Sequence, residues 1–386
     1  MDMDKIRADL CSDIVHLNNC GAGLMPKPVL DAVINHLHRE AEIGGYEAAR
    51  DALPAIEHTY DAIATMLNCH RDEIAVVENA TVAWDMAFYG FPLKRGDVVL
   101  TAMAEYASNY IAYLQRAQRD GIEIRVIPND EHGQTDVAAL ASMIDDRVKL
   151  ISITHAPTNG GLINPAAAIG KVAKDAGIPY LLDACQSAGQ MPLDVEAIGC
   201  DFLSATGRKY LRGPRGTGFL YVRAGMLNKL DPPVLDLHSG IWTAPDRFEI
   251  LPNARRFENW ENYIAGKIGL GVAVDYALAI GLDAIAHRVQ TLAKNLRARM
   301  AELPGVTVND IGEKKSGIIS FSIRDEDPQS VLETMQAKGI NISTSGSTST
   351  LLDMEQRGIT AMNRLGLHYC NTEEELDRFL ACLAAI

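Results

Sequence analysis

The chain has 386 residues and a formal net charge of −14, from 36 basic and 50 acidic side chains, and 47% of its residues are hydrophobic. This length predicts two or three domains, and the composition excludes a disordered or repeat-built chain. The acidic balance excludes binding to the phosphate backbone of nucleic acids, which requires a surplus of Lys and Arg on one face. No run of about 18 apolar residues occurs, so no membrane span is predicted.

The seven cysteines are scattered and form no Cys-x-x-Cys pair, which favours reduced thiols over disulfides or a zinc site. The first ten residues carry acids where a signal or transit peptide carries basic and apolar side chains. His36 and His38 lack metal-binding spacing and fall on a helix predicted to be solvated. We therefore expect a cytoplasmic protein without a metal site.

Short apolar runs alternate with helical patterns between residues 72 and 222. In one connector, Asn164 offers an N-cap, Pro165 suits the first helical position and Gly177 marks the end of the helix. Such units predict an α/β fold with a mainly parallel sheet, whose ligand lies at the carboxyl ends of the strands. The seven predicted strands are Ile74–Val77, Val98–Thr101, Ile122–Ile127, Val148–Thr154, Tyr180–Asp183, Phe202–Ala205 and Gly218–Val222.

The pattern changes beyond residue 265, where two long helices precede short strands and further helices. We predict a large domain over residues 21–265 and a smaller C-terminal α/β domain over residues 266–386. Residues 1–20 are too short to fold alone and are expected to pack on the small domain. The elements predicted there are helices Ile264–Ile280, Asp283–Leu303, Pro328–Ala337 and one starting after Asn371 near Thr372, and strands Val306–Asn309, Gly317–Ile323 and Ile340–Ser343.

Polar side chains follow several of the strands. Ala80 and Thr81 open a helix in a small-residue turn, which offers N–H groups and a hydroxyl to an anion or simply forms an N-cap. Tyr106 offers a flat face to a ring or is a core aromatic. Asp183 ends an apolar strand, where a carboxylate requires a cationic partner; a helix cap or a salt bridge is the alternative.

Lys209 follows another strand, between small residues, where partial desolvation makes an amine a nucleophile. Thr206 and Arg208 are candidates to bind a phosphate beside it. A Walker A loop and a Gly-x-Gly-x-x-Gly motif are both absent, which disfavours a nucleotide.

Pyridoxal 5′-phosphate matches all of these features. It has an aldehyde for the amine, a ring nitrogen that a buried carboxylate keeps protonated, a flat face, a ring hydroxyl and a phosphate. The candidate partners are, in that order, Lys209; Asp183; Tyr106; Gln186 or Thr158; and Ala80, Thr81, Thr206 and Arg208.

With these motifs in order along the chain, the sequence resembles the class V aminotransferase family of fold type I, which includes the cysteine desulfurases and selenocysteine lyases. The resemblance implies a large domain with a mainly parallel seven-stranded sheet and a smaller C-terminal domain. The matching segments are Leu17–Asn19, Asn79–Thr81, Glu105–Asn109, His155–Gly161, Asp183–Gln186, Ser204–Lys209, Arg256–Glu258 and Arg364–Thr372.

The resemblance also implies residue roles and a partner. Lys209 binds the cofactor covalently, Asp183 pairs with its ring nitrogen and Arg364 binds the carboxylate of an amino-acid substrate. The ring is contacted by Gln186, Thr158 and Tyr106. Gly21, Ala22 and Tyr46 are expected at the substrate entrance, with Tyr46 supplied by the second subunit of a homodimer whose site lies at the interface.

Three departures bear on the substrate. The family's desulfurases carry a sulfur-accepting Cys shortly before the carboxylate-binding Arg, but residues 343–350 contain none, and Cys370 lies beyond Arg364. Tyr106 replaces a His, and Trp260-Glu261 replaces a Gly-Thr-Pro that binds the phosphate of the neighbouring subunit. Together with the segments Glu40–Tyr46, Pro157–Gly161 and Ser347–Asp353, these features resemble the branch of hercynylcysteine sulfoxide lyases and isopenicillin N epimerase-like proteins.

The leading hypothesis is therefore a pyridoxal-phosphate-dependent lyase that eliminates a sulfur group from the β-carbon of an amino acid and yields pyruvate and ammonia. An aminotransferase or an amino-acid epimerase of the same family is the alternative. A catalytically idle scaffold with this fold is the third hypothesis, which the presence of both Asp183 and Lys209 disfavours.

Overall fold

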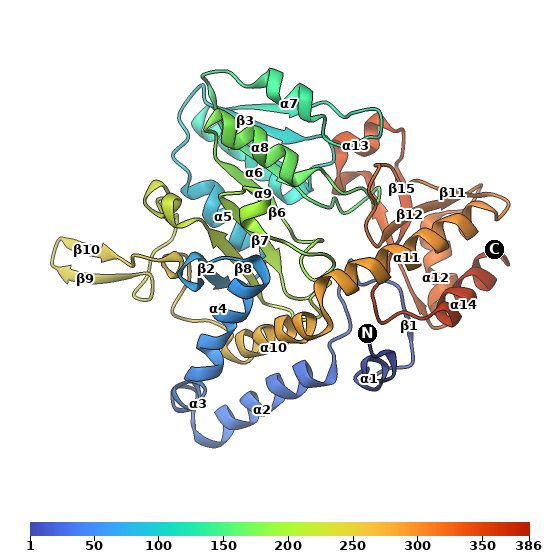
Figure 1. Cartoon of the computed structure of the whole chain (residues 1–386), viewed down its shortest axis with the longest axis horizontal. Coiled ribbons are helices and arrows are strands. Elements are labelled where there is room, and N and C mark those ends of the chain that lie inside the picture. Colours follow the sequence, from blue (N-terminus) through green and yellow to red (C-terminus); the bar gives the residue numbers. More distant parts are fainter.

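The computed structural model describes residues 1–386, and a seven-stranded sheet forms its centre (Figure 1). The strand order is β2-β8-β7-β6-β5-β3-β4, and only β8 runs antiparallel to its neighbours. The predicted mainly parallel, seven-stranded sheet is thus confirmed. The strands are β2 (Ile74–Val77), β3 (Val98–Ala102), β4 (Glu123–Ile127), β5 (Val148–Thr154), β6 (Tyr180–Asp183), β7 (Phe202–Thr206) and β8 (Gly218–Val222).

Both faces of this sheet are buried. Successive side chains of a strand point to opposite faces, so Ile74 and Val76 join one hydrophobic cluster while Ala75 and Val77 join another. Burial on both sides explains why these strands are continuous apolar runs. Helices α4 (Leu53–Leu67), α8 (Ala166–Ala176) and α10 (Ile264–Ile280) contribute to the first cluster, and α5 (Ala80–Gly90) and α6 (Ala107–Asp120) to the second.

The connector before α8 differs from its prediction at one end. Helix α8 begins at Ala166 with Pro165 as the N-cap residue, so the predicted N-cap at Asn164 is wrong. The Asn164 side chain instead accepts hydrogen bonds from the N–H and hydroxyl of Thr135 and donates to the carbonyl of Thr154 at 2.8 Å. At the other end, Gly177 stops the helix as predicted, with φ +68°.

The C-terminal part contains a second, antiparallel sheet of order β11-β12-β15-β14. Strand β1 (Val15–His16) pairs in parallel with β13 (Ile340–Asn341), and Val15 and Leu17 lie in the hydrophobic cluster of this part. The division into residues 1–20, 21–265 and 266–386 stays a prediction. The other elements here are α11 (Leu282–Ala301), β11 (Val306–Val308), β12 (Ile318–Ile323), α12 (Pro328–Ala337), β14 (Ser343–Gly346), α13 (Leu351–Gln356), β15 (Ala361–Gly366) and α14 (Glu373–Leu383).

One strand predicted over Ile340–Ser343 is wrong, because the chain forms two strands there. Strand β13 pairs with β1, whereas β14 pairs with β15, and the buried Ile342 separates them. The two halves of the apolar run therefore belong to different sheets. The last helix agrees with its prediction: Thr372 caps α14, and the Glu375 side chain completes a capping box.

A hairpin of β9 (Gly240–Ala244) and β10 (Arg247–Ile250) was not predicted, and it projects away from the body of the molecule (Figure 1). Helices α2 (Lys27–Ile43) and α3 (Gly45–Asp51) precede α4. The prediction that His36 lies on a solvated helix is wrong for its side chain, because only 6% of the residue is exposed. No single helix has the length and apolar composition to cross a membrane; α10 and α11 meet that test only as a pair, bent by 78°.

Candidate active site

A cavity of about 380 Å³ lies where strands of the large sheet end. Strand β6 ends at Asp183 and β7 at Thr206, and both residues line the cavity. This edge of the sheet is where a mainly parallel α/β fold binds ligands. The predicted residues that line it together are Ala80, Thr81, Tyr106, Asp183, Thr206, Arg208 and Lys209, joined by Asn79, Val82, Asn109 and Cys185.

One end of the cavity is the N-terminus of α5. Asn79 caps this helix by accepting a hydrogen bond from the N–H of Val82 at 2.9 Å. The first-turn N–H groups of Ala80 and Thr81 have no acceptor within the chain. A helix N-terminus with free N–H groups attracts an anion, so this end suits a phosphate. The N-cap and anion-binding interpretations of this turn are thus compatible.

Thr206 and Arg208 complete this side of the cavity in different ways. Thr206 donates its hydroxyl hydrogen to the carbonyl of Thr217 at 3.3 Å, which leaves the oxygen lone pairs available. Arg208 donates from Nη1 to the carbonyl of Gly21 and thereby links the predicted Gly21–Ala22 entrance to the cavity wall.

Asp183 is 5% exposed, and each of its carboxylate oxygens accepts one hydrogen bond. Oδ1 accepts from the N–H of Cys185 at 2.8 Å and Oδ2 from the side-chain amide of Asn109 at 2.9 Å. Burial raises the pKa of Asp183, while these two hydrogen bonds and the charge of Lys209 act in the opposite direction. A buried carboxylate of this kind is stabilised by a cation in the cavity.

Lys209 is 8% exposed, and its amine lies close to the Cys185 thiol and to the Asp183 carboxylate. Two glycines pack tightly against the backbone that carries it. A Cβ at Gly23 would lie 2.5 Å from the carbonyl oxygen of Lys209, and a Cβ at Gly189 would lie 2.6 Å from the backbone of Tyr210. The lysine is therefore positioned by close backbone packing on both sides, and its amine is available for another group.

Arg364, Thr158 and Gln186 form a chain of contacts beside the cavity. Arg364 Nη1 donates to the carbonyl of Thr158 at 3.1 Å and also to its hydroxyl. Gln186 Nε2 donates to the Thr158 hydroxyl at 3.4 Å and to the carbonyl of Cys20 at 3.2 Å. The buried Oε1 of Gln186 has no partner. The predicted substrate-binding Arg and the two predicted ring contacts are thus adjacent.

The two predicted tyrosines differ in location. Tyr106 is 38% exposed, precedes α6 as its N-cap residue and lines the cavity. Tyr46 is 76% exposed and lines a different cavity of about 590 Å³, together with Arg50 and Trp260. The chain by itself does not bring Tyr46 to the site, so its place there stays a prediction that requires a second copy.

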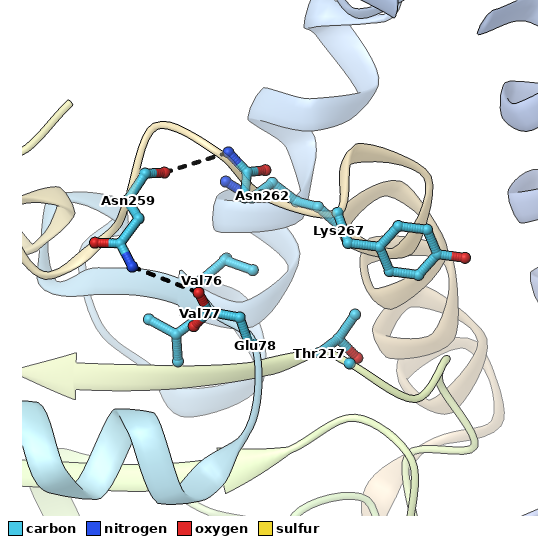
Figure 2. A pocket seen from close by; sticks show the side chains of 9 residues that line it. Val76, Val77, Glu78, Thr217, Asn259, Asn262 and Lys267 are labelled. Atoms are coloured by element: carbon cyan, nitrogen blue, oxygen red, sulfur yellow. Dashed lines mark hydrogen bonds between the residues drawn. The ribbon is translucent and has the colours of Figure 1, made fainter. Parts of the chain in front are cut away.

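A much smaller cavity lies behind the N-terminus of α5 (Figure 2). The Asn259 amide reaches Glu78 Oε1 at 3.5 Å, and the Asn262 amide reaches the Asn259 carbonyl at 3.4 Å. Its volume of about 20 Å³ suits a single water molecule and excludes a cofactor. The larger cavity beside Lys209 is therefore the candidate active site.

Asn109 and Cys185 line the cavity, although the sequence analysis gave neither of them a role. Asn109 binds Asp183 directly, and its spacing of four residues from Glu105 at the start of a helix was the available signal. Cys185 lines the cavity beside Asp183, and burial raises the pKa of its thiol. A sequence pattern does not show the contact of Asn109 with Asp183, because these two residues are 74 positions apart along the chain.

The family profile of class V aminotransferases matches residues 15–379. The chain belongs to the class V aminotransferase family. A probable cysteine desulfurase of Methanothermobacter thermautotrophicus is 30% identical over 98% of the chain and 96% of its own length. A probable cysteine desulfurase of Xylella fastidiosa is 31% identical over 97% and 91%. The apo cysteine desulfurase of Thermococcus onnurineus NA1 superposes with a TM-score of 0.92 and 26% identity, over 99% of this chain and 97% of that one.

Class V aminotransferases use pyridoxal 5′-phosphate, and this member is a pyridoxal-phosphate-dependent enzyme. The cavity fits the cofactor on its own chemistry. It offers a buried amine at Lys209, a buried carboxylate that needs a cation at Asp183, and free N–H groups at Ala80 and Thr81. The orphaned oxygen of Gln186 beside the cavity can accept a hydrogen bond from a ring hydroxyl.

Proposed function

We propose that this enzyme is a C–S lyase that removes a sulfur group from the β-carbon of an amino acid and yields pyruvate and ammonia. The proposal is supported by the segment next to Arg364. Ser343 in β14 is paired with Arg364 in β15, and Arg364 Nε lies 3.3 Å from the Ser343 hydroxyl. The segment that starts there, residues 343–350, carries hydroxyl side chains and no Cys.

A desulfurase requires a thiol that accepts sulfur from its substrate, and the cysteines nearest in sequence to Asp183 and Arg364, which are Cys185 and Cys370, are poorly suited to that role. Cys185 is the one cysteine that lines the cavity, and it lies two residues from Asp183 with a raised pKa. Cys370 is buried, and burial raises its pKa as well. A thiol with a raised pKa is a poor nucleophile at neutral pH. Elimination, which needs no protein thiol, therefore fits the site better than sulfur transfer.

Each residue of the site has its own role in this reaction. Pyridoxal phosphate, which Lys209, Asp183 and the N–H groups of Ala80 and Thr81 would hold, would supply an electron sink for the α-carbon of the amino acid. Asp183 keeps the ring nitrogen protonated, and the Arg364 guanidinium binds the substrate carboxylate as a charged fork. The Lys209 amine removes the proton from Cα as a general base. The Cβ–S bond then breaks with its electron pair leaving on sulfur, and water releases pyruvate and ammonia from the remaining three-carbon fragment.

A homodimer with sites at its interface is part of this proposal. Large apolar side chains are exposed around the cavity that contains Tyr46, including Leu53 at 52% and Trp260 at 49%. The projecting hairpin exposes Trp242 at 80% and Phe248 at 58%. Exposed apolar surface of this extent is typical of a protein interface.

The free cysteines further support a reducing compartment, the cytoplasm.

The proposal is tested by incubating the purified holoenzyme with cysteine, cystine, cysteine S-conjugates and cysteine sulfoxides, and by quantifying pyruvate, ammonia and alanine. We expect pyruvate and ammonia in equal amounts from at least one S-substituted cysteine, and no sulfur adduct on the protein by intact mass. The Lys209→Ala variant is the control that separates enzymatic from spontaneous elimination.

Other outcomes contradict the proposal in distinct ways. Alanine as the product, together with a protein persulfide, identifies a desulfurase. Accumulation of pyridoxamine phosphate identifies an aminotransferase, and inversion at Cα without elimination identifies an epimerase. No turnover of any amino acid in a panel, with the cofactor bound, identifies a scaffold.

A further inference from the structure

Asn109 connects two buried carboxyl groups with the two protons of one amide. Its Nδ2 lies 2.9 Å from Asp183 Oδ2 and 2.9 Å from Glu105 Oε1. Glu105, Asn109 and Asp183 are 3%, 4% and 5% exposed. The amide therefore has no proton left for water or for another acceptor.

Glu105 accepts hydrogen bonds on both of its carboxyl oxygens. Its Oε1 accepts hydrogen bonds from Asn109, from the N–H of Tyr106 at 2.9 Å and from the hydroxyl of Thr154. Its Oε2 accepts from the Thr101 hydroxyl at 3.1 Å and from the N–H of Thr154 at 3.2 Å. The three N–H groups can only donate and fit an ionised Glu105, whereas the two Thr hydroxyls can also accept a hydrogen bond from a protonated carboxyl group.

These contacts restrict the carboxylate that faces the cavity. One donor on each oxygen of Asp183 prevents its carboxylate plane from rotating, and a lone pair on each oxygen remains for a ligand. The Cys185 N–H is a backbone donor and is set by the chain itself. The other donor, the Asn109 amide, is oriented only because Glu105 binds its second proton.

We propose that Glu105 and Asn109 are positioning residues that hold Asp183 against the ring nitrogen of the cofactor and add a second negative charge behind it. This inference rests on the proposed role of Asp183. Two linked carboxylates favour a protonated ring nitrogen more than Asp183 alone does, because opposite charges at short range stabilise the charged form. Neither residue touches the reacting carbon, so they act through Asp183.

The other ionisable groups around this chain of contacts are few. Lys209 and Cys185 adjoin Asp183 in the cavity, and two buried tyrosines lie near Glu105: Tyr113, whose hydroxyl is 2.7 Å from Ser152, and Tyr180. Burial raises the pKa of Glu105 to about 7, while the hydrogen bonds from Thr154, Asn109 and Tyr106 lower it. The second charge is thus present above neutral pH, and measurements above about pH 7 are the informative ones.

The test uses holoenzyme loaded with pyridoxal phosphate that is ¹⁵N-labelled in the ring. The ¹⁵N chemical shift and the visible absorption of the bound cofactor are recorded against pH for wild type, Asn109→Ala and Glu105→Gln. In both variants we expect the ring nitrogen to lose its proton at a pH about one to two units lower than in wild type. Asn109 lines the cavity, so the Asn109→Ala variant is expected to fold and keeps the proposal testable if Glu105→Gln fails to fold.

Two further variants make the result unambiguous. Ser152→Ala removes a buried hydroxyl from the same region without touching the amide and is expected to behave as wild type. Asp183→Asn is the positive control and is expected to lose the ring proton at the lowest pH. This inference alone is overturned if the ring nitrogen titrates as in wild type in both Asn109→Ala and Glu105→Gln, while its titration is shifted in Asp183→Asn. An unshifted Asp183→Asn overturns the role of Asp183 and with it the proposed function.

Discussion

Arg364 and Thr158 are joined by two hydrogen bonds although they are 206 positions apart in the sequence. One guanidinium nitrogen of Arg364 donates both to the carbonyl of Thr158, at 3.1 Å, and to its hydroxyl. Nε points to Ser343, and Nη2 has no acceptor within the chain. The guanidinium is therefore oriented by Thr158 and Ser343, while its Nη2 stays available to a substrate carboxylate.

Replacing Arg364 by Lys or Ala is expected to raise the KM for the amino-acid substrate. A charge-assisted hydrogen bond contributes about 1.5–3 kcal/mol, which corresponds to an increase on the order of tenfold to a hundredfold. Steady-state kinetics with the substrate identified above measure it. The matched control is Arg299→Lys, an exposed Arg paired with Asp377, for which KM is expected to be unchanged. An unchanged KM in Arg364→Ala would remove this residue from carboxylate binding.

Replacing Lys209 by Ala is expected to lower turnover about 100- to 10,000-fold, because the general base and the covalent attachment are lost together. Circular dichroism is expected to match wild type. Borohydride reduction followed by peptide mass analysis should place the cofactor on Lys209 in wild type and on no lysine in the variant. Lys171→Ala, an exposed lysine, serves as the control. Cofactor found on a different lysine of the wild type would contradict the assignment.

Gly189→Ala is expected to destabilise the protein and weaken cofactor binding. Gly189 has φ +83°, and an added Cβ would lie 2.6 Å from the backbone of Tyr210 and Leu211, next to Lys209. The left-handed conformation alone costs about 1–2 kcal/mol for a residue with a Cβ, and the clash adds to it. Gly177→Ala is a matched control, because Gly177 has φ +68° but nothing within 4 Å of an added Cβ. Only Gly189→Ala should lose cofactor on dialysis, and equal behaviour of both variants would refute the packing argument.

The buried ion pair between Glu258 and Lys267, 3.0 Å apart, is expected to make stability acid-sensitive. Burial raises the pKa of Glu258, but Lys267, His238 and donors from Val76 and Tyr60 outweigh it and lower this pKa to about 2. Because the folded-state pKa lies below the unfolded value of 4.5, this stabilisation is complete above pH 4.5. It is lost as the pH falls from 4.5 towards about 2.

Urea unfolding across that pH range measures this effect. Glu258→Gln leaves Lys267 buried without its partner and is expected to cost about 3–5 kcal/mol at neutral pH, with a shallower loss of stability in acid. Glu131→Gln, at a highly exposed acid, is the control. If the free energy of unfolding falls equally steeply with decreasing pH in wild type and in Glu258→Gln, other groups cause the pH dependence.

A mixture of Lys209→Ala and Tyr46→Ala subunits is expected to be more active than either variant alone. Tyr46 lies outside the cavity of its own chain, so a mixed dimer contains one site with both residues intact. Activity is measured after refolding the two variants together, and analytical ultracentrifugation gives the oligomeric state. No gain on mixing would place Tyr46 outside the site of the partner subunit.

The elements around the site were predictable where their signals are local. Strand β6 and helix α10 have the bounds expected from their apolar runs, and Gly177 ends its helix as expected. Buried strands and helix ends are encoded by neighbouring residues, which is why these predictions succeeded. The predictions failed where a side chain is used elsewhere: Asn164 binds Thr135 instead of capping a helix, and the run at 340–343 is shared by two sheets.

The sequence by itself determined the family, the cofactor and the polar side chains that follow the strands, because each of these depends on motifs of a few adjacent positions. Tertiary structure alone decided which distant side chains meet: Arg364 with Thr158, and Asn109 with Asp183. These contacts depend on strand order, which a local pattern does not encode. A hydrogen bond forms only when donor and acceptor come within about 3 Å, and for residues far apart in the chain only the folded packing sets that distance.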